Sequence, residues 1–161
     1  MDNGFAHVGL ATHNMASTID FYCRLLGCRI LGDERIEIGS GGEVRQVSID
    51  VGRDQYIVFM QSVGVQGIPD DFETSINAPL GLPAGMYHIS LSVRTLDELT
   101  AKANTLTGHG VKVSEVTDLG IAKSVFLADP NGIQIELSVR IRAFDASDVG
   151  RVTRAEVAKR N

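Results

Sequence analysis

Long apolar stretches, an excess of basic residues and paired cysteines are all missing from this chain of 161 residues. Its longest apolar runs have the length of single β-strands, far short of the ~20 residues that a membrane-spanning helix needs. Residues 1–5 contain neither a basic segment nor an apolar one. We therefore expect no secretory signal, no membrane partner and a cytoplasmic location.

The charge balance is acidic, with 15 Lys and Arg against 20 Asp and Glu and a formal net charge of -5. Proteins that bind nucleic acid usually present basic patches, so nucleic acid is not an expected partner and a small molecule is favoured. The only two cysteines, Cys23 and Cys28, form neither a CxxC motif nor a disulfide framework. We interpret them as reduced thiols that pack in the interior.

What the sequence does contain is an internal repeat. A short apolar segment with His7 precedes a helical pattern that ends at Gly27, and His88 and Gly108 bracket the same pattern in the second half. Gly27 follows His7 by 20 positions, and Gly108 follows His88 by the same number. The matching spacings indicate a duplicated module.

Local signals give both modules the same order of elements. Ser17 is expected to cap the first helix and Thr95 the second, where Glu98 completes a capping box. Three strand candidates follow each helix, at 29–36, 44–51 and 56–60 in the first half and at 111–116, 123–128 and 133–139 in the second. The Asp-Pro-Asn-Gly segment 129–132 predicts a tight turn between the last two. Each half therefore reads β-α-β-β-β.

The same signals set the expected boundaries. We place the first module at residues 1–62 and the second at 85–140. The segment 63–84 is rich in Gly, Pro and Asp and is interpreted as a linker loop. The remaining residues, 141–161, are predicted to form an exposed helical tail.

Two histidines and one carboxylate form the candidate metal site. His7 and His88 occupy equivalent positions of the repeat, so they should face one another if the modules pack with pseudo-twofold symmetry. Glu136 alternates with apolar neighbours and therefore points to the opposite face of its strand. Two imidazoles and a carboxylate are the ligand set of non-haem iron(II) oxygenases, and they also suit other divalent ions. We predict one bound divalent metal, with Fe2+ ahead of Mn2+, Ni2+, Co2+ or Zn2+.

The position of a fourth ligand is occupied by an apolar residue. When the turns of the two modules are aligned, Val58 matches Glu136. A register slip of one residue exchanges the faces of a strand, and in that case Gln55 or Gln61 could bind the metal instead. Three protein ligands and an open position for solvent or substrate are the prediction.

Taken together, these motifs resemble the vicinal oxygen chelate superfamily, which includes glyoxalase I, bleomycin and fosfomycin resistance proteins, methylmalonyl-CoA epimerase and extradiol ring-cleaving dioxygenases. The resemblance covers residues 5–140 and includes His7 ahead of Ile19-Asp20-Phe21-Tyr22, His88-Ile89-Ser90-Leu91, and the turn 129–132 leading into Ile135-Glu136-Leu137. It implies an α+β fold of two paired βαβββ modules that form a curved incomplete barrel. It also implies a small-molecule ligand and a homodimer.

The resemblance also guides the expected activity. In glyoxalase-like members the positions of His7, His88 and Glu136 are metal ligands, and the fourth ligand, missing here at Val58, is usually Glu or Gln. The loss disfavours glyoxalase and epimerase chemistry and leaves the ligand set of the extradiol dioxygenases. Those enzymes also resemble one another in a Tyr in the strand before the Asp-Pro turn, and this chain departs from them with Phe126 at that position. On the strength of the three-ligand set, we expect a metal-dependent oxygenase acting on a catechol-like vicinal-oxygen molecule, ahead of a glyoxalase-type lyase or isomerase. A non-catalytic antibiotic- or metabolite-binding protein is the remaining alternative.

Five further residues are candidates for the site. Tyr56 falls on the inward face in the same alignment, so it is either a catalytic hydroxyl near the metal or a packing residue. His13 follows the first strand and is either an acid–base group or part of a surface loop. Gln134, Arg45 and Phe126 are candidate substrate contacts, although Arg45 also fits a solvated strand face.

Overall fold

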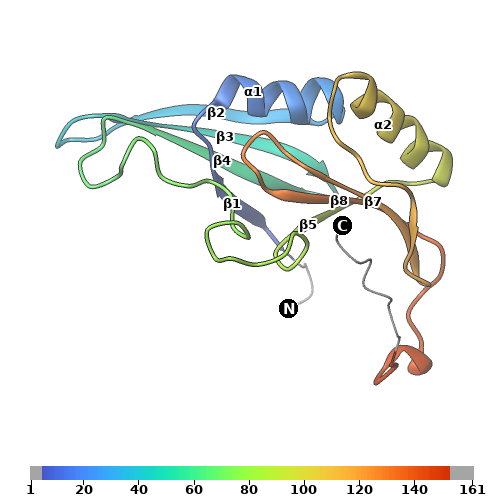
Figure 1. The fold of residues 1–161 in the computed structure, drawn as a ribbon. Coiled ribbons are helices and arrows are strands. Elements are labelled where there is room, and N and C mark those ends of the chain that lie inside the picture. Colours follow the sequence, from blue (N-terminus) through green and yellow to red (C-terminus); the bar gives the residue numbers. More distant parts are fainter. Residues whose placement is uncertain (1–4, 153–161) are drawn as a thin grey trace.

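Two four-stranded sheets with the longer helices on one side make up residues 5–152, the part of the chain that the computed structural model describes (Figure 1). The first sheet has the order β1 (His7–Ala11), β4 (Gln55–Val63), β3 (Glu43–Gly52), β2 (Arg29–Glu37), and the second has the order β5 (Ile89–Ser92), β8 (Gln134–Arg140), β7 (Ala122–Ala128), β6 (Thr117–Asp118). β1 runs parallel to β4, and β5 runs parallel to β8, whereas the other neighbouring strands are antiparallel. The predicted α+β fold of two βαβββ modules is confirmed, and the sheets do not close into a barrel.

The first helix begins three residues earlier than the sequence suggested. It consists of α1 (Met15–Ile19) and a π-helical segment, η1 (Asp20–Leu25). Asn14 is the N-cap, and its side chain accepts a hydrogen bond of 3.0 Å from the backbone N–H of Ser17. Ser17 was therefore the wrong cap, because an Asn lies nearer to the end of β1 and caps a helix equally well.

The second helix, α2 (Leu96–Gly108), begins as predicted. Thr95 accepts a hydrogen bond of 3.1 Å from the backbone N–H of Glu98. The repeat is less regular at the other end of the helix. Gly108 is still helical, and the left-handed residue that follows the helix is Gly110, with φ of 81°.

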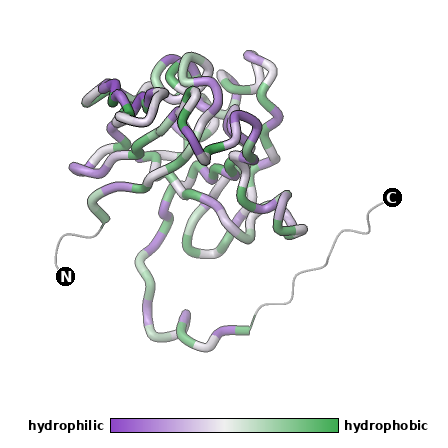
Figure 2. The backbone as a smooth tube through the Cα atoms, turned by 90° about the vertical axis from the view of Figure 1, so that its left-hand side faces the viewer, coloured by the Kyte–Doolittle hydropathy of each residue, from purple (hydrophilic) through white to green (hydrophobic). Residues whose placement is uncertain are grey.

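Two other elements differ from the expectation. No strand forms at 111–116, and β6 contains only two residues. The segment still runs beside β7, where the Ser114 hydroxyl accepts the backbone N–H of Phe126 at 2.9 Å. A side chain thus takes a bond that a backbone ladder would use. Within residues 141–152 the tail forms one short 3₁₀ turn, η2 (Ala146–Asp148). The tube that leads to the grey C-terminal segment extends away from the rest of the molecule (Figure 2), and the rest of the predicted helix lies outside the described residues.

A single hydrophobic core joins the two modules and includes Phe59 and Leu99. A buried polar network accompanies it. Tyr22 donates a hydrogen bond of 3.1 Å to Asp129, and Asn131 donates one of 3.2 Å to Thr18. Burial raises the pKa of Asp129, although the hydrogen bonds that its carboxylate accepts oppose this effect. Because buried polar groups are costly unless they are paired, this network fixes the first helix against the turn that precedes β8.

Within the described part of the chain, no helix is both long and apolar enough to cross a membrane.

Candidate metal and substrate site

Strand pairing establishes which positions of the two modules are equivalent. Gly9 lies opposite Val58 in the first sheet, and Ser90 lies opposite Glu136 in the second. Gly9 and Ser90 each follow their module's histidine by two positions, so Val58 and Glu136 occupy matching places. The alignment made from the sequence is confirmed at this point, and the fourth ligand position carries a buried valine.

A histidine–carboxylate pair lies at the centre of the second sheet. Glu136, on β8, is only 7% exposed, and its Oε2 lies 3.2 Å from Nε2 of His88. Its other oxygen accepts a hydrogen bond of 2.5 Å from the hydroxyl of Ser124 on β7. The charge of this buried carboxylate is therefore held by one imidazole and one hydroxyl, which is the kind of pairing that burial requires.

The ring of His88 is oriented by the backbone. His88 directly precedes β5, and its Nδ1 lies 2.8 Å from the carbonyl oxygen of Gly85. A carbonyl oxygen only accepts hydrogen bonds, so Nδ1 carries a proton and donates it. Nε2 is left facing Glu136. Metal-binding histidines commonly donate one ring N–H to a backbone carbonyl in this way, which directs the other nitrogen at the metal.

The pair matches the spacing of two neighbouring metal ligands. Metal–nitrogen and metal–oxygen bonds of about 2.0–2.2 Å place adjacent ligand atoms roughly 3 Å apart, and His88 Nε2 and Glu136 Oε2 are separated by 3.2 Å. In residues 5–152, however, no three His, Cys, Asp or Glu side chains are grouped closely enough to hold a metal. The structure therefore brings together two of the three residues that the sequence predicts as ligands.

His7 lies on the first sheet, next to Tyr56. The two residues are neighbours in the parallel β1–β4 pair, and their rings stack with centroids 5.2 Å apart and an interplanar angle of 23°. Alternation along β4 places Tyr56 and Val58 on one face of this sheet. The structure thus brings His7 and Tyr56 together on one module, and His88 and Glu136 together on the other.

Two other candidates have partners elsewhere. The ring of His13 packs on Phe72 with centroids 4.4 Å apart, and its Nε2 contacts the carbonyl oxygen of the same residue. His13 therefore attaches the linker to the end of β1. Arg45 forms two hydrogen bonds with Asp33, and it lies on the same face of β3 as the buried Val47 two positions later. Neither residue contacts the His88–Glu136 pair.

An apolar cavity of about 260 Å³ adjoins His88. Its apolar and aromatic lining consists of Val8, Leu10, Ile76, Met86, Tyr87, Ile89 and Ile133. The polar lining residues are Asn77, His88 and Gln134. Asn77 is already used, because its amide both donates to and accepts from the backbone of Tyr87 at 2.8 and 2.9 Å. Both ring nitrogens of His88 also have partners, so Gln134 is the polar lining side chain that this cavity offers to a ligand. Among the described residues, no Lys or Arg lines the cavity.

The sequence did not point to Ser124, Gly85 or Asn77 as parts of this site. Ser124 lies on β7, two positions before Phe126, a predicted substrate contact that lies directly opposite Glu136 in the β7–β8 pair. Counting back through the predicted Asp-Pro-Asn-Gly hairpin would have placed Ser124 beside Glu136. The contributions of Gly85 and Asn77 depend on the path of the linker, which leaves no periodic signal.

A sequence model of the glyoxalase/bleomycin resistance protein/dioxygenase superfamily matches residues 4–137. The chain therefore belongs to that superfamily, whose members bind small molecules, commonly use a divalent metal and often form dimers. No curated protein matches the sequence.

Solved structures with low sequence identity share the fold. The protein SMU.1112c is 20% identical, with a TM-score of 0.66 over 86% of this chain and 99% of that one. Trypanothione-dependent glyoxalase I of Leishmania major is 19% identical, with a TM-score of 0.56 over 82% of this chain and 83% of that one. TnmS3, an antibiotic-binding protein from Streptomyces sp. CB03234, is 18% identical, with a TM-score of 0.58 over 87% and 98%. An enzyme and a binding protein thus share this scaffold, so the activity has to be argued from the site.

Proposed function

We propose that this protein is a divalent-metal-dependent enzyme that acts on a small molecule with two neighbouring oxygens. The observation that carries the proposal is the 3.2 Å approach of His88 Nε2 to Glu136 Oε2, with each partner held by a further hydrogen bond. A metal bound there would act as a Lewis acid toward the oxygens of the substrate. Ser124 and the Gly85 carbonyl would keep the two ligands oriented.

The third ligand is His7, contributed by a second copy of the chain. Two facts support this arrangement. His7 is exposed on the first sheet, and within the described residues it does not join His88 and Glu136 in a group of three. A twofold dimer would place the first module of one copy on the second module of the other and would create two equivalent sites. Tyr56, stacked on His7, would then supply a hydroxyl near the metal.

A mixing experiment tests the source of His7. The variants His7→Ala and Glu136→Ala should each lose metal binding. If the site lies between two chains, unfolding and refolding an equal mixture forms dimers in which one of the two sites has all its ligands, and about a quarter of the metal capacity returns. If the site lies within one chain, the mixture binds no more metal than the separate variants.

The cavity next to His88 would hold the body of the substrate. Its lining is apolar and lacks cationic side chains, so it favours a neutral hydrophobic or aromatic group over a phosphate or a peptide-like anion. Gln134 would bind a polar substituent, and Phe126 would pack beside Glu136. The valine at position 58 leaves a metal position open, and this favours an Fe2+-dependent oxygenase over a glyoxalase-type isomerase or lyase.

The first activity to test is the oxygen-dependent cleavage of catechol. Protein loaded anaerobically with Fe2+ should bind catechol and consume oxygen with it, and Glu136→Gln should abolish both. Glu98→Gln, on α2 and outside this site, is the matched control and should react as the unmodified protein does. If the Fe2+ protein neither binds catechols nor consumes oxygen with them, the oxygenase is excluded. Lyase and isomerase assays with Mn2+, Ni2+, Co2+ and Zn2+ then follow.

A second function is favoured by the cavity itself. An apolar pocket with Gln134 available to a polar substituent would also suit a non-catalytic protein that sequesters an antibiotic or a metabolite. Such a protein should bind its ligand equally well after treatment with a chelator. His7→Ala should leave its affinity unchanged, whereas the metal-dependent enzyme should lose substrate binding in both experiments.

A further inference from the structure

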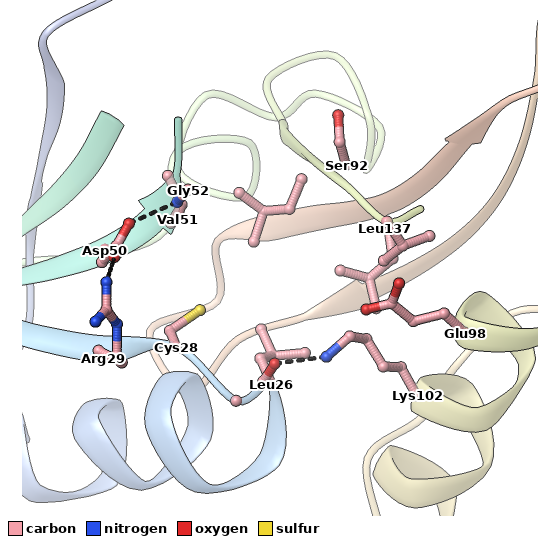
Figure 3. Close-up of a pocket in the computed structure, with 13 residues that line it drawn as sticks. Leu26, Cys28, Arg29, Asp50, Val51, Gly52, Ser92, Glu98, Lys102 and Leu137 are labelled. Atoms are coloured by element: carbon pink, nitrogen blue, oxygen red, sulfur yellow. Dashed lines mark hydrogen bonds and ion pairs between the residues drawn. The ribbon is translucent and has the colours of Figure 1, made fainter. Parts of the chain in front are cut away.

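A second cavity, of about 310 Å³, lies between the two modules and close to both helices (Figure 3). From the first module it is lined by Leu26 and Cys28, which follow η1, and by Asp50 near the end of β3. From the second module it is lined by residues of β5, α2 and β8. It shares no lining residue with the cavity beside His88. It therefore offers a separate place for a ligand.

Three of the four charged residues in this lining have partners. Arg29 donates a hydrogen bond of 2.6 Å to Asp50 (Figure 3). Glu98 accepts hydrogen bonds of 3.1 and 3.2 Å from the backbone and side chain of Arg94, and the pKa of its carboxyl is lowered chiefly by the backbone bond. These groups neutralise one another and leave no net demand for a counter-ion.

Lys102 is the exception. Its ammonium donates a hydrogen bond of 2.7 Å to the carbonyl oxygen of Leu26, and among the described residues no carboxylate lies within 4.0 Å of it. Glu98 is one helical turn away, and its pKa reflects the Lys102 charge, but the two side chains form no ion pair. An ammonium has three N–H donors, so two are available to a ligand. A half-buried cation without a carboxylate partner is an attractive place for an anion.

The rest of the cavity is suited to an apolar group. Leu91, Val93 and Leu137 line it beside Lys102, and the thiol of Cys28 points into the space between the charged groups (Figure 3). Burial raises the pKa of that thiol to about 11, so it remains neutral at neutral pH. Among the described lining residues, Lys102 is the one cation without a carboxylate partner, so the cavity matches a singly charged anion better than a multiply charged one such as phosphate.

We propose that this cavity binds a small monocarboxylate with an apolar body. The carboxylate accepts hydrogen bonds from Lys102, and the body packs on Leu91, Val93 and Leu137. Because the ligand binds the folded chain and not the unfolded one, its binding raises the temperature of unfolding. Metal binding by His88 and Glu136 is not required for this site.

Benzoate and hexanoate are the probes, and benzamide is the uncharged counterpart of benzoate. Calorimetric titration of the metal-free full chain should give a Kd on the order of 1 mM for a ligand of this size, at least about tenfold below that of benzamide. Lys102→Gln should weaken benzoate binding by about tenfold or more, because a charge-assisted hydrogen bond is lost. The exposed Lys112→Gln, which removes the same charge elsewhere, should bind as the unmodified protein does.

Amide chemical shifts give the location of binding. Benzoate should move the resonances of Gly27, Cys28 and Ser92, and leave that of Gln134 in place. The proposal is overturned if neither benzoate nor hexanoate binds, if Lys102→Gln leaves the affinity unchanged, or if benzamide binds as tightly as benzoate. Shifts confined to the cavity beside His88 would also overturn it. None of these results depends on metal loading, so they are separate from the test of the enzymatic function.

Discussion

Tyr22 and Asp129 lie 107 positions apart in the sequence and form a buried hydrogen bond of 3.1 Å between the first helix and the turn before β8. The bond ties the module that carries His7 to the strand that carries Glu136. Tyr22→Phe should lower the free energy of unfolding by about 1 kcal/mol, because Asp129 keeps its other donors. Asp129→Ala should cost more, about 2–4 kcal/mol, since it leaves several buried donors without an acceptor.

Urea denaturation measures both effects. Tyr87→Phe is the control, because this tyrosine is 52% exposed and the same hydroxyl removal should change stability little. Equal losses in Tyr22→Phe and Tyr87→Phe would show that the hydrogen bond to Asp129 does not hold the modules together.

The Cys28 thiol should react slowly. Its pKa is raised from 9.0 to about 11, first by burial and then by the nearby Cys23, so at pH 8 its thiolate population is about 100-fold below that of an ordinary cysteine. Alkylation followed by peptide mass spectrometry should show a rate that rises tenfold per pH unit up to about pH 11. The folded protein holds this proton more tightly than the unfolded chain, so the same group lowers the free energy of unfolding as pH rises from 9.0 through about 11. A rate that levels off below pH 9 would contradict this environment.

Ser124 should matter to metal affinity through Glu136. The Ser124 hydroxyl donates a hydrogen bond of 2.5 Å to one carboxylate oxygen of Glu136, and it also lies 3.0 Å from the hydroxyl of Ser138. Ser124→Ala should weaken metal binding by about 10- to 100-fold, as the loss of a group that orients a ligand usually does. Ser138→Ala leaves the bond to Glu136 intact and should bind metal normally. Competition with a chromogenic chelator measures both affinities, and equal values in the two variants would exclude this role.

Gly27 should be required at the end of the first helix. Its φ of 78° lies in the left-handed region, where a side chain costs about 1–2 kcal/mol. Gly27→Ala should lower the free energy of unfolding by about that amount. Gly32, within β2, has no neighbour within 4 Å of an added Cβ and no positive φ, so Gly32→Ala should leave stability unchanged or slightly higher. Thermal unfolding distinguishes the two, and equal stabilities would mean that the helix ends without strain.

The sequence was informative wherever a local signal and a repeat agreed. The equal spacings from His7 to Gly27 and from His88 to Gly108 predicted two modules, and the turn alignment correctly matched Val58 to the position of Glu136. Prediction from the sequence failed where a single local hydrogen bond formed with a different group from the one expected. Asn14 rather than Ser17 caps the first helix, and Ser114 interrupts the strand expected at 111–116.

Convergence of residues from different modules was harder to predict. The internal repeat shows that His7 and His88 occupy corresponding positions, but the distance between them depends on how the two modules pack. Part of the wall of the apolar cavity comes from Ile76 and Asn77 of the linker. The path of the linker is set by contacts such as Asn77 with Tyr87 and His13 with Phe72. These contacts are specific to the folded chain and follow no helical or strand period.

The metal content of freshly purified protein, measured by mass spectrometry, tests the central claim most directly. We predict about one divalent ion per chain, lost in His88→Ala and in Glu136→Ala and retained in the control Glu98→Gln. Protein that contains no metal and takes up none from Fe2+, Mn2+, Ni2+ or Zn2+ would contradict the account. Metal that persists in both site variants would contradict it equally.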